Sequence, residues 1–215
     1  MSTTLVVNEI YLSLQGESTF AGLPCVFIRL TACDLRCSYC DTEYAFTGGQ
    51  EVSVESIVAD VEARGVPLVL LTGGEPLLQR ELPALCAALL DKKFEVMIET
   101  GGHRDTSALP AGVVVILDVK TPGSGEAAKM CWANLERLGP RDAVKFVVTD
   151  ERDYEWARTL IREKRLDARC HVLVSPAFGQ VEPKNLVAWM LRDKLPARLN
   201  LQIHKYVWPP DERGV

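Results

Sequence analysis

The segment Val26–Thr42 reads VFIRLTACDLRCSYCDT, and it joins a short apolar run to three closely spaced cysteines. Cys33, Cys37 and Cys40 fall within eight residues, so their thiolates can all reach one inorganic centre. A closed structural zinc site needs four ligands, and an electron-transfer [4Fe–4S] cluster needs four cysteines. No Cys/His pair further along the chain completes such a set. The spacing therefore predicts a [4Fe–4S] cluster on three thiolates, with the fourth iron open for chemistry.

The remaining four cysteines are Cys25, Cys86, Cys131 and Cys170. The total of seven is odd, and a disulfide framework is not expected in a reducing compartment. We predict that these four behave as small buried hydrophobes. Three unligated cysteines in a loop are the plain alternative to the cluster, but cysteines at ligand spacing seldom lack a ligand.

Outside this segment, short apolar runs alternate with stretches of helical periodicity. The predicted strands are Val26–Thr31, Leu68–Thr72, Glu95–Glu99, Val113–Asp118, Ala143–Thr149 and His171–Val174. The predicted helices are Val54–Arg64, Leu82–Lys92, Glu126–Leu138, Arg152–Lys164 and Pro183–Asp193. This alternation predicts an α/β fold with a parallel sheet and right-handed crossovers.

We expect one domain over residues 1–215, with an N-terminal flanking segment 1–23 and a C-terminal closing strand and tail 199–215. Within these flanks, Val6–Leu14 reads as a leading strand and Leu199–Val207 as a closing strand. No internal repeat and no linker-like composition divides the chain.

Polar motifs follow the predicted strands at their carboxyl ends. They are Thr72-Gly73-Gly74-Glu75-Pro76, Glu99-Thr100-Gly101-Gly102, Asp118-Val119-Lys120 and Ser175-Pro176, besides the cysteines themselves. The carboxyl edge of a parallel sheet or barrel is where ligands bind. The sequence therefore predicts that these motifs line one site.

The bulk composition is that of an ordinary globular protein, with 215 residues of which 47% are hydrophobic and 25% charged. The net charge is −5, and no basic stripe suggests a nucleic-acid partner. No run of about 18 apolar residues suggests a membrane span, and no signal-peptide pattern opens the chain. We expect a cytoplasmic protein that acts on a small molecule.

The cysteine spacing, the aromatic residue Tyr39 and the Gly-Gly-Glu-Pro motif at 73–76 together resemble the radical S-adenosylmethionine (SAM) superfamily. The resemblance implies a partial (β/α)6 barrel. It also implies that the amino and carboxylate groups of SAM chelate the open iron, and that an electron then splits SAM into methionine and a 5′-deoxyadenosyl radical. Glu75 would accept from the SAM ammonium, which Gly74 and its neighbours would meet.

A narrower resemblance is to the 7-carboxy-7-deazaguanine synthase family of the queuosine and 7-deazapurine pathway. It is carried, in family order, by Glu9-Ile10, Leu14-Gln15-Gly16-Glu17, Arg29, Cys40-Asp41-Thr42, Thr72-Gly73-Gly74-Glu75-Pro76, Ile98-Glu99-Thr100 and Gln202-Ile203-His204-Lys205. That family converts 6-carboxy-5,6,7,8-tetrahydropterin into 7-carboxy-7-deazaguanine with loss of ammonia and with magnesium assistance. The resemblance further implies an external flavodoxin- or ferredoxin-like reductant and a homodimer.

The resemblance implies three sets of site residues beyond the cluster ligands. The substrate set is Leu14, Gln15 and Gly16 through their backbone groups, with Arg29, Thr72 and His204. The SAM set is Tyr39, Cys40, Asp41, Gly74, Glu75, Glu99, Asp118, Lys120 and Ser175. Thr42 would supply a hydroxyl to Mg²⁺, which prefers oxygen ligands.

Several of these residues have plain structural alternatives. Arg29 could form an internal ion pair, Thr42 could be a turn-forming hydroxyl, and His204 could be a satisfied strand histidine. Two motifs depart from the family pattern, because Asp118-Val119-Lys120 replaces a common Ser-Pro-Lys and Ser175-Pro176 replaces a common Gln-Pro. The tail from Trp208 onward is assigned no substrate role.

Two other functions stay open on the sequence. A radical SAM activase that makes a glycyl radical on a partner protein would be similarly small, but would not need the Leu14–Glu17 motif or Arg29. A non-enzymatic module that holds an iron–sulfur cluster or zinc would need only the cysteines.

Overall fold

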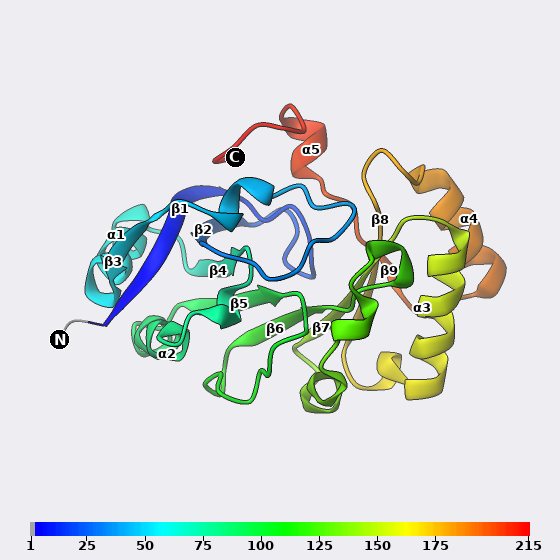
Figure 1. Ribbon diagram of the computed structural model, residues 1–215, viewed down its shortest axis with the longest axis horizontal. Coiled ribbons are helices and arrows are strands. Elements are labelled where there is room, and N and C mark those ends of the chain that lie inside the picture. Colours follow the sequence, from blue (N-terminus) through cyan, green and yellow to red (C-terminus); the bar gives the residue numbers. More distant parts are fainter. Residues whose placement is uncertain (1–2) are drawn as a thin grey trace.

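The computed structural model describes residues 3–215, and its strands form one continuous open sheet (Figure 1). The strands are β1 Thr4–Leu14, β2 Pro24–Leu30, β3 Gln50–Ser53, β4 Leu68–Gly73, β5 Glu95–Thr100, β6 Val114–Asp118, β7 Ala143–Val148, β8 His171–Pro176 and β9 Arg198–Leu199. Their order is β3-β1-β2-β4-β5-β6-β7-β8-β9. Pairing is parallel from β2 to β9, and β1 is antiparallel to both of its neighbours. The six predicted strands are therefore confirmed as a parallel set.

Four helices cover the outer face of this curved sheet. They are α1 Val54–Arg64, α2 Leu82–Asp91, α3 Glu151–Lys164 and α4 Pro183–Asp193. The short α5 His204–Val207 lies instead at the opening of the sheet's inner face. α1 begins where Ser53 accepts a hydrogen bond from the Ser56 amide, and it ends at Gly65 in the left-handed conformation. These caps fix the two ends of the helix that connects β3 to β4.

Two predicted elements were wrong. The helix expected over Glu126–Leu138 is instead a series of 3₁₀ turns, η4 Ala127–Lys129 and η5 Trp132–Arg137. The buried Asn134 explains the difference, because its amide donates to the Gly102 carbonyl and accepts from the Thr106 amide. These bonds hold the segment against the loop after β5, and tertiary contacts override helix propensity.

The closing strand expected over Leu199–Val207 is also absent. Only Arg198–Leu199 pairs with β8, and the Asn200 amide makes the last bond, to the Val174 carbonyl. The chain then turns toward the cysteine loop and forms α5. The sequence also missed β3, which pairs with β1 at the edge of the sheet.

Two apolar layers hold the helices to the sheet. α1 and α2 pack on β1, β2, β4 and β5, and α3 and α4 pack on β6, β7 and β8 (Figure 1). Cys25, Cys86 and Cys170 are buried as predicted, whereas Cys131 is only half-buried. Within residues 3–215, no helix combines the length and the apolar content needed to cross a bilayer.

The concave face of the sheet carries a regular change from apolar to polar residues. On β2 and on β4 to β8, the inward residue near the carboxyl end is polar, and the inward residue two positions earlier is apolar. The pairs are Phe27/Arg29, Leu70/Thr72, Met97/Glu99, Ile116/Asp118, Ala143/Lys145 and Leu173/Ser175. Successive inward residues on a strand are two apart. The inner face of the sheet is therefore an apolar layer away from the carboxyl ends of the strands. At the carboxyl ends, polar side chains form the floor of a cavity.

Candidate active site

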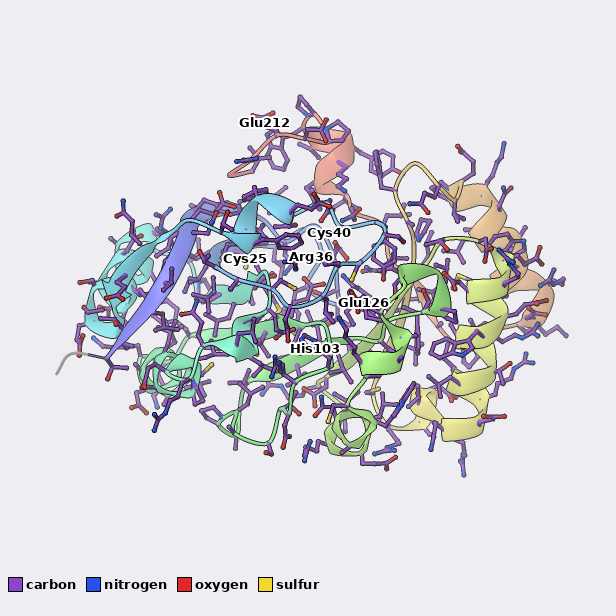
Figure 2. The ribbon with its side chains drawn as sticks, in the orientation of Figure 1. Cys25, Arg36, Cys40, His103, Glu126 and Glu212 are labelled. Carbon is purple, nitrogen blue, oxygen red and sulfur yellow. The ribbon has the colours of Figure 1, made fainter. Side chains whose placement is uncertain are left out.

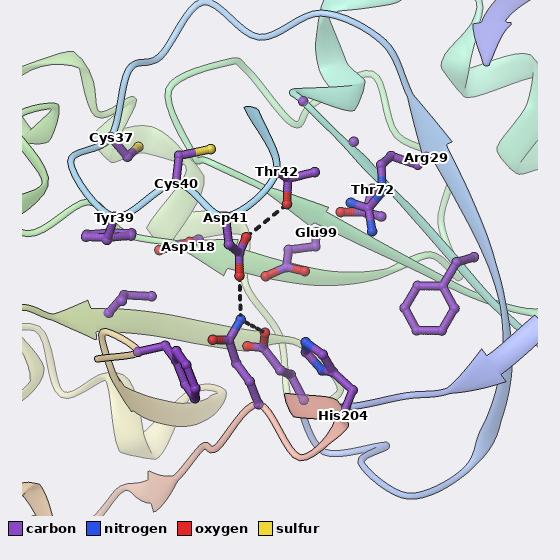
Figure 3. Close-up of a pocket in the computed structure, with 18 of the residues that line it drawn as sticks. Arg29, Cys37, Tyr39, Cys40, Asp41, Thr42, Thr72, Glu99, Asp118 and His204 are labelled. Carbon is purple, nitrogen blue, oxygen red and sulfur yellow. Dashed lines mark hydrogen bonds between the residues drawn. The ribbon is translucent and has the colours of Figure 1, made fainter. Parts of the chain in front are cut away.

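A cavity of about 880 Å³ opens at the carboxyl ends of the parallel strands. All the site residues predicted from the sequence border it, including Cys33, Cys37 and Cys40. Figure 3 shows Cys37 and Cys40 together with several of the others. The structure therefore brings the predicted motifs to one cavity, while the role of each residue stays a prediction.

The cysteine loop between β2 and η1 (Glu43–Phe46) is held from both sides. The Arg36 amide donates to the Glu126 carboxylate (Figure 2). His103, in the segment after β5, lies with its Nε2 2.6 Å from the Asp34 carboxylate. The Ser38 amide donates to the Ser124 carbonyl at 3.0 Å. These contacts order the loop independently of any bound group.

The thiols of Cys33, Cys37 and Cys40 are half-buried at the rim of the cavity. Burial raises the pKa of each thiol. Because iron binds the thiolate form, each thiol would have to release a proton on becoming a ligand.

Gly73 and Gly74 are required by the packing of the cysteine loop. A Cβ on Gly73 would lie 2.4 Å from the Leu30 carbonyl oxygen, and a Cβ on Gly74 would lie 2.0 Å from the Ala32 carbonyl oxygen. The Ala32 carbonyl also accepts the Glu75 amide at 2.7 Å. The paired glycines thus let the end of β4 lie directly against the backbone that leads into Cys33.

Glu75 is 1% exposed and is already well supplied with donors. Its carboxylate accepts from the Thr100 hydroxyl and from the amides of Gly101 and Leu77. Burial raises its pKa, although these donors and the nearby His103 oppose the rise. In this arrangement Glu75 ties the end of β4 to the end of β5, which differs from the free acceptor that the sequence suggested.

Polar atoms without protein partners point to ligand contacts in the cavity. Within the described residues, the Tyr39 hydroxyl, one carboxylate oxygen of Asp118 and the side-chain nitrogen of Gln15 are buried with no hydrogen-bond partner. The other Asp118 oxygen accepts from the Lys120 ammonium at 2.8 Å. Buried polar groups in native proteins are normally satisfied, so these atoms fit ligands that supply the missing partners. Tyr39 and Asp118 lie on the cysteine side, where a cluster and SAM would bind.

Arg29 lies beside Thr72, its register partner on β4. Its Nε donates to Glu9 at 2.7 Å and its Nη2 donates to the Tyr11 hydroxyl at 3.0 Å. The internal ion pair considered from the sequence therefore exists. A guanidinium has five N–H donors, so three remain, on Nη1 and Nη2, at the end of the side chain that faces the cavity. Arg29 can keep Glu9 and still bind a second carboxylate.

The Gln15 amide is already used, because it donates to the Leu23 carbonyl. The Gln15 carbonyl accepts from the Gly22 amide and keeps a second lone pair for a ligand. Gln15 also offers its unpartnered side-chain nitrogen to the cavity. Gly16 meets the His204 ring so closely that a Cβ would lie 2.1 Å from Nδ1. Burial lowers the pKa of His204, so the ring is neutral in neutral solution.

Thr42 is the last residue of the cysteine loop, and its hydroxyl donates to the Asp41 carboxylate at 2.9 Å. Asp41 also accepts from Gln202 at 2.9 Å and from Lys205 at 2.7 Å, which joins the loop to the C-terminal segment (Figure 3). The Thr42 hydroxyl oxygen keeps lone pairs that could ligate a cation.

The sequence missed two parts of the site. Lys145 on β7 lies on the cavity floor, and the tail Pro210–Val215 borders the opening, with Arg213 stacked 4.0 Å above the Tyr44 ring. A charged residue within the apolar run of β7 was the available signal for Lys145. The tail carried no comparable signal, because its place depends on the turn after β9.

The chain is similar to known proteins over almost its whole length. The family model described as the radical SAM superfamily matches residues 27–121. A 7-carboxy-7-deazaguanine synthase from Koribacter versatilis (strain Ellin345) is 45% identical, over 97% of this chain and 99% of that protein. One from Chlorobaculum tepidum is 44% identical, over 98% and 97%. The crystal structure of QueE from Escherichia coli superimposes with a TM-score of 0.76 at 23% identity, over 92% of this chain and 93% of that one.

Proposed function

The chain belongs to the 7-carboxy-7-deazaguanine synthase family of the radical SAM superfamily, and we propose that it converts 6-carboxy-5,6,7,8-tetrahydropterin into 7-carboxy-7-deazaguanine with loss of ammonia, in queuosine and 7-deazapurine biosynthesis. The observation that carries the proposal is one cavity that joins three cysteine thiols to an arginine able to bind a carboxylate. The activase and the non-enzymatic module explain only the thiols.

The cofactors are a [4Fe–4S] cluster and SAM, which together supply the radical that starts the reaction. Cys33, Cys37 and Cys40 would hold three irons. The unpartnered carboxylate oxygen of Asp118 would accept a hydrogen bond from SAM, and the unpartnered Tyr39 hydroxyl would donate one. The remaining SAM contacts would come from Cys40, Asp41, Gly74, Glu75, Glu99, Lys120 and Ser175.

The substrate would lie between the cysteine side and Arg29. The Arg29 fork would bind the pterin carboxylate through two parallel hydrogen bonds. Thr72, the Gln15 side chain and the neutral His204 ring would then face the polar edge of the ring system. The backbone at Leu14 and Gly16 would complete the wall of the cavity.

The direct test is anaerobic incubation of the reconstituted protein with SAM, dithionite and the carboxypterin. We expect 7-carboxy-7-deazaguanine by mass spectrometry, and 5′-deoxyadenosine in amounts that depend on the pterin. Formation of 5′-deoxyadenosine that responds to a peptide substrate but not to the pterin would favour the activase. One zinc per chain instead of about four irons would favour the metal module.

An external reductant of the flavodoxin or ferredoxin type would supply the electron. The cysteine loop lies at the surface, with Asp34, Arg36 and Ser38 exposed, so a donor protein can come close to the cluster. We also propose a homodimer, on the family resemblance, and sedimentation velocity tests it directly.

Replacing Arg29 by lysine should weaken pterin binding by about 1–3 kcal/mol, the range for a lost charge-assisted hydrogen bond. Lysine keeps the charge but cannot hold Glu9 and a substrate carboxylate with one planar fork. The measurement is the Kd of the pterin and of SAM for both proteins. Equal losses for the two ligands would show that Arg29 only supports the sheet.

Replacing Thr42 by alanine should selectively impair the magnesium-dependent part of the reaction. The proposed role of the ion is to orient the pterin and to stabilise negative charge on it. Product formation should fall by about tenfold, the effect of losing one contact of roughly 1.4 kcal/mol. SAM binding should be unchanged.

Product rate against Mg²⁺ concentration checks this, with Thr47→Ala as a control on a nearby exposed threonine. Superimposable Mg²⁺ curves for the wild type and Thr42→Ala would show that Thr42 is a turn residue.

A further inference from the structure

Lys145 is the charged residue at the centre of the cavity floor. Its side chain is 7% exposed, and its ammonium contacts Glu17 at 3.1 Å, makes a short contact with Glu99 and lies 3.9 Å from Asp118. Glu17 follows β1, Glu99 is on β5 and Asp118 ends β6. Asp118 is also the register partner of Lys145 across β6 and β7. One ammonium therefore gathers carboxylates from three separate elements.

Other polar and charged groups also contact the carboxylates around Lys145. Glu17 also accepts from the amides of Asn200 and Gln202, and Asp118 also accepts from Lys120. Three other titratable groups lie near the set. They are Tyr39, whose pKa Lys145 lowers against the effect of burial, Cys37, whose pKa burial and Asp118 both raise, and His204, whose pKa Glu17 raises against the effect of burial. Three carboxylates and two ammonium groups thus lie together at the cavity.

Both glutamates line the cavity, and both contact Lys145. Glu17 lies next to Gln15 and Gly16, on the side proposed for the pterin, and Glu99 lies on the side proposed for SAM. A carboxylate has about four lone-pair positions, so each glutamate can bind Lys145 and still accept an N–H or O–H from a ligand.

We propose that Lys145 is a positioning residue that keeps Glu17 and Glu99 ionised and oriented, so that one carboxylate receives the pterin and the other receives SAM. The inference rests on the proposed function, because it assigns a pterin to one side and SAM to the other. Lys145 itself donates to the two glutamates and not to either ligand.

The electrostatics give the proposal a direction. Burial raises the pKa of Glu99, and Lys145 is the largest opposing influence. Burial lowers the pKa of Lys145, but Glu17 and Glu99 outweigh it and hold the pKa well above its ordinary value. Without the ammonium, Glu99 loses its main stabilising charge while Glu17 and Asp118 stay close to it, so the pKa of Glu99 rises further. Glu99 would then bind a proton more readily as the pH falls, and SAM binding would fall with it. Glu17 would lose the ammonium that holds its carboxylate in place.

The test uses Lys145→Gln, which keeps a hydrogen-bond donor but removes the charge. The reconstituted protein is titrated with SAM, and separately with the carboxypterin, by anaerobic equilibrium dialysis between about pH 6 and 9. We expect SAM to bind at least about tenfold more weakly to the variant near pH 6.5, the effect of one pKa unit. The SAM deficit should shrink toward pH 9. The pterin should also bind more weakly, because Glu17 is no longer held in place.

Two further variants separate positioning from general damage. Lys145→Arg keeps the charge, and its binding should follow the wild-type pH profile. Arg158→Met removes a partly buried ion pair with Asp193, between α3 and α4 and remote from the cavity, so it should lower the melting temperature without altering the pH profile. Should Lys145→Gln lose its cluster, Glu17→Gln and Glu99→Gln take its place, and each should weaken only its own ligand.

A Lys145→Gln deficit in SAM binding that is equal at every pH, or that Arg158→Met reproduces, would overturn the inference. So would the loss of both ligands in either glutamate variant. Failure of the wild-type protein to bind the pterin or to form product is a different result, because it overturns the proposed function itself.

Discussion

Replacing Cys37 by serine is expected to abolish both cluster assembly and SAM cleavage. The Cys37 thiolate is one of the three proposed iron ligands, and a serine hydroxyl is a poor substitute for soft sulfur. Reconstituted wild-type protein should hold about four irons per chain and absorb in the visible range, whereas the variant should hold little iron. 5′-Deoxyadenosine should then be undetectable above background.

Cys131→Ser is the matched control, because Cys131 is a half-buried cysteine in the turn before η5 and does not border the cavity. It should retain iron and SAM cleavage. If the Cys37→Ser protein cleaved SAM at close to the wild-type rate, the proposal that this loop holds the cluster would be wrong.

Replacing Gly74 by alanine should both destabilise the protein and impair the cluster. The new methyl would lie 2.0 Å from the Ala32 carbonyl oxygen and 3.1 Å from the Cys33 amide nitrogen. Both are backbone atoms, so the cysteine loop itself must move. Overpacking of this kind costs about 1–3 kcal/mol and sometimes more. We expect a lower urea midpoint together with reduced iron retention.

Gly139→Ala controls for the loss of glycine entropy, because its Cβ would meet only the Asp142 carboxylate at an ordinary 3.7 Å. Its stability should remain close to that of the wild type or rise slightly. If Gly74→Ala retained wild-type iron and stability, the close approach of β4 to the loop would play no part in holding the cluster.

The sequence predicted the strands and the location of the site well, because both depend on local patterns. Short runs such as Leu68–Thr72 are apolar and buried on both faces, and polar motifs must gather where parallel strands end. The caps of α1 were readable for the same reason, since Ser53 and Gly65 act on their own neighbours.

Features that depend on distant contacts were not predictable. The Glu9–Arg29 pair requires the register of an antiparallel strand, in which these residues stand opposite each other. The 3₁₀ turns around Asn134 require the loop after β5. Lys145 could be placed in a strand, but its three carboxylate neighbours come from segments 27 to 128 residues away in the chain.

The contacts at the cavity mouth join segments that lie far apart in the sequence, and they therefore limit when the site can be completed during folding. Glu17 bonds to Gln202 across 185 residues, and Asp41 bonds to Lys205 across 164. During synthesis, the N-terminal strands and the cysteine loop leave the ribosome long before their C-terminal partners exist. Such long-range contacts form late, because bringing distant segments together costs entropy. Delivery of iron and sulfide to the nascent chain would therefore meet an open, oxidisable loop, and we expect productive cluster insertion to follow release of the finished polypeptide.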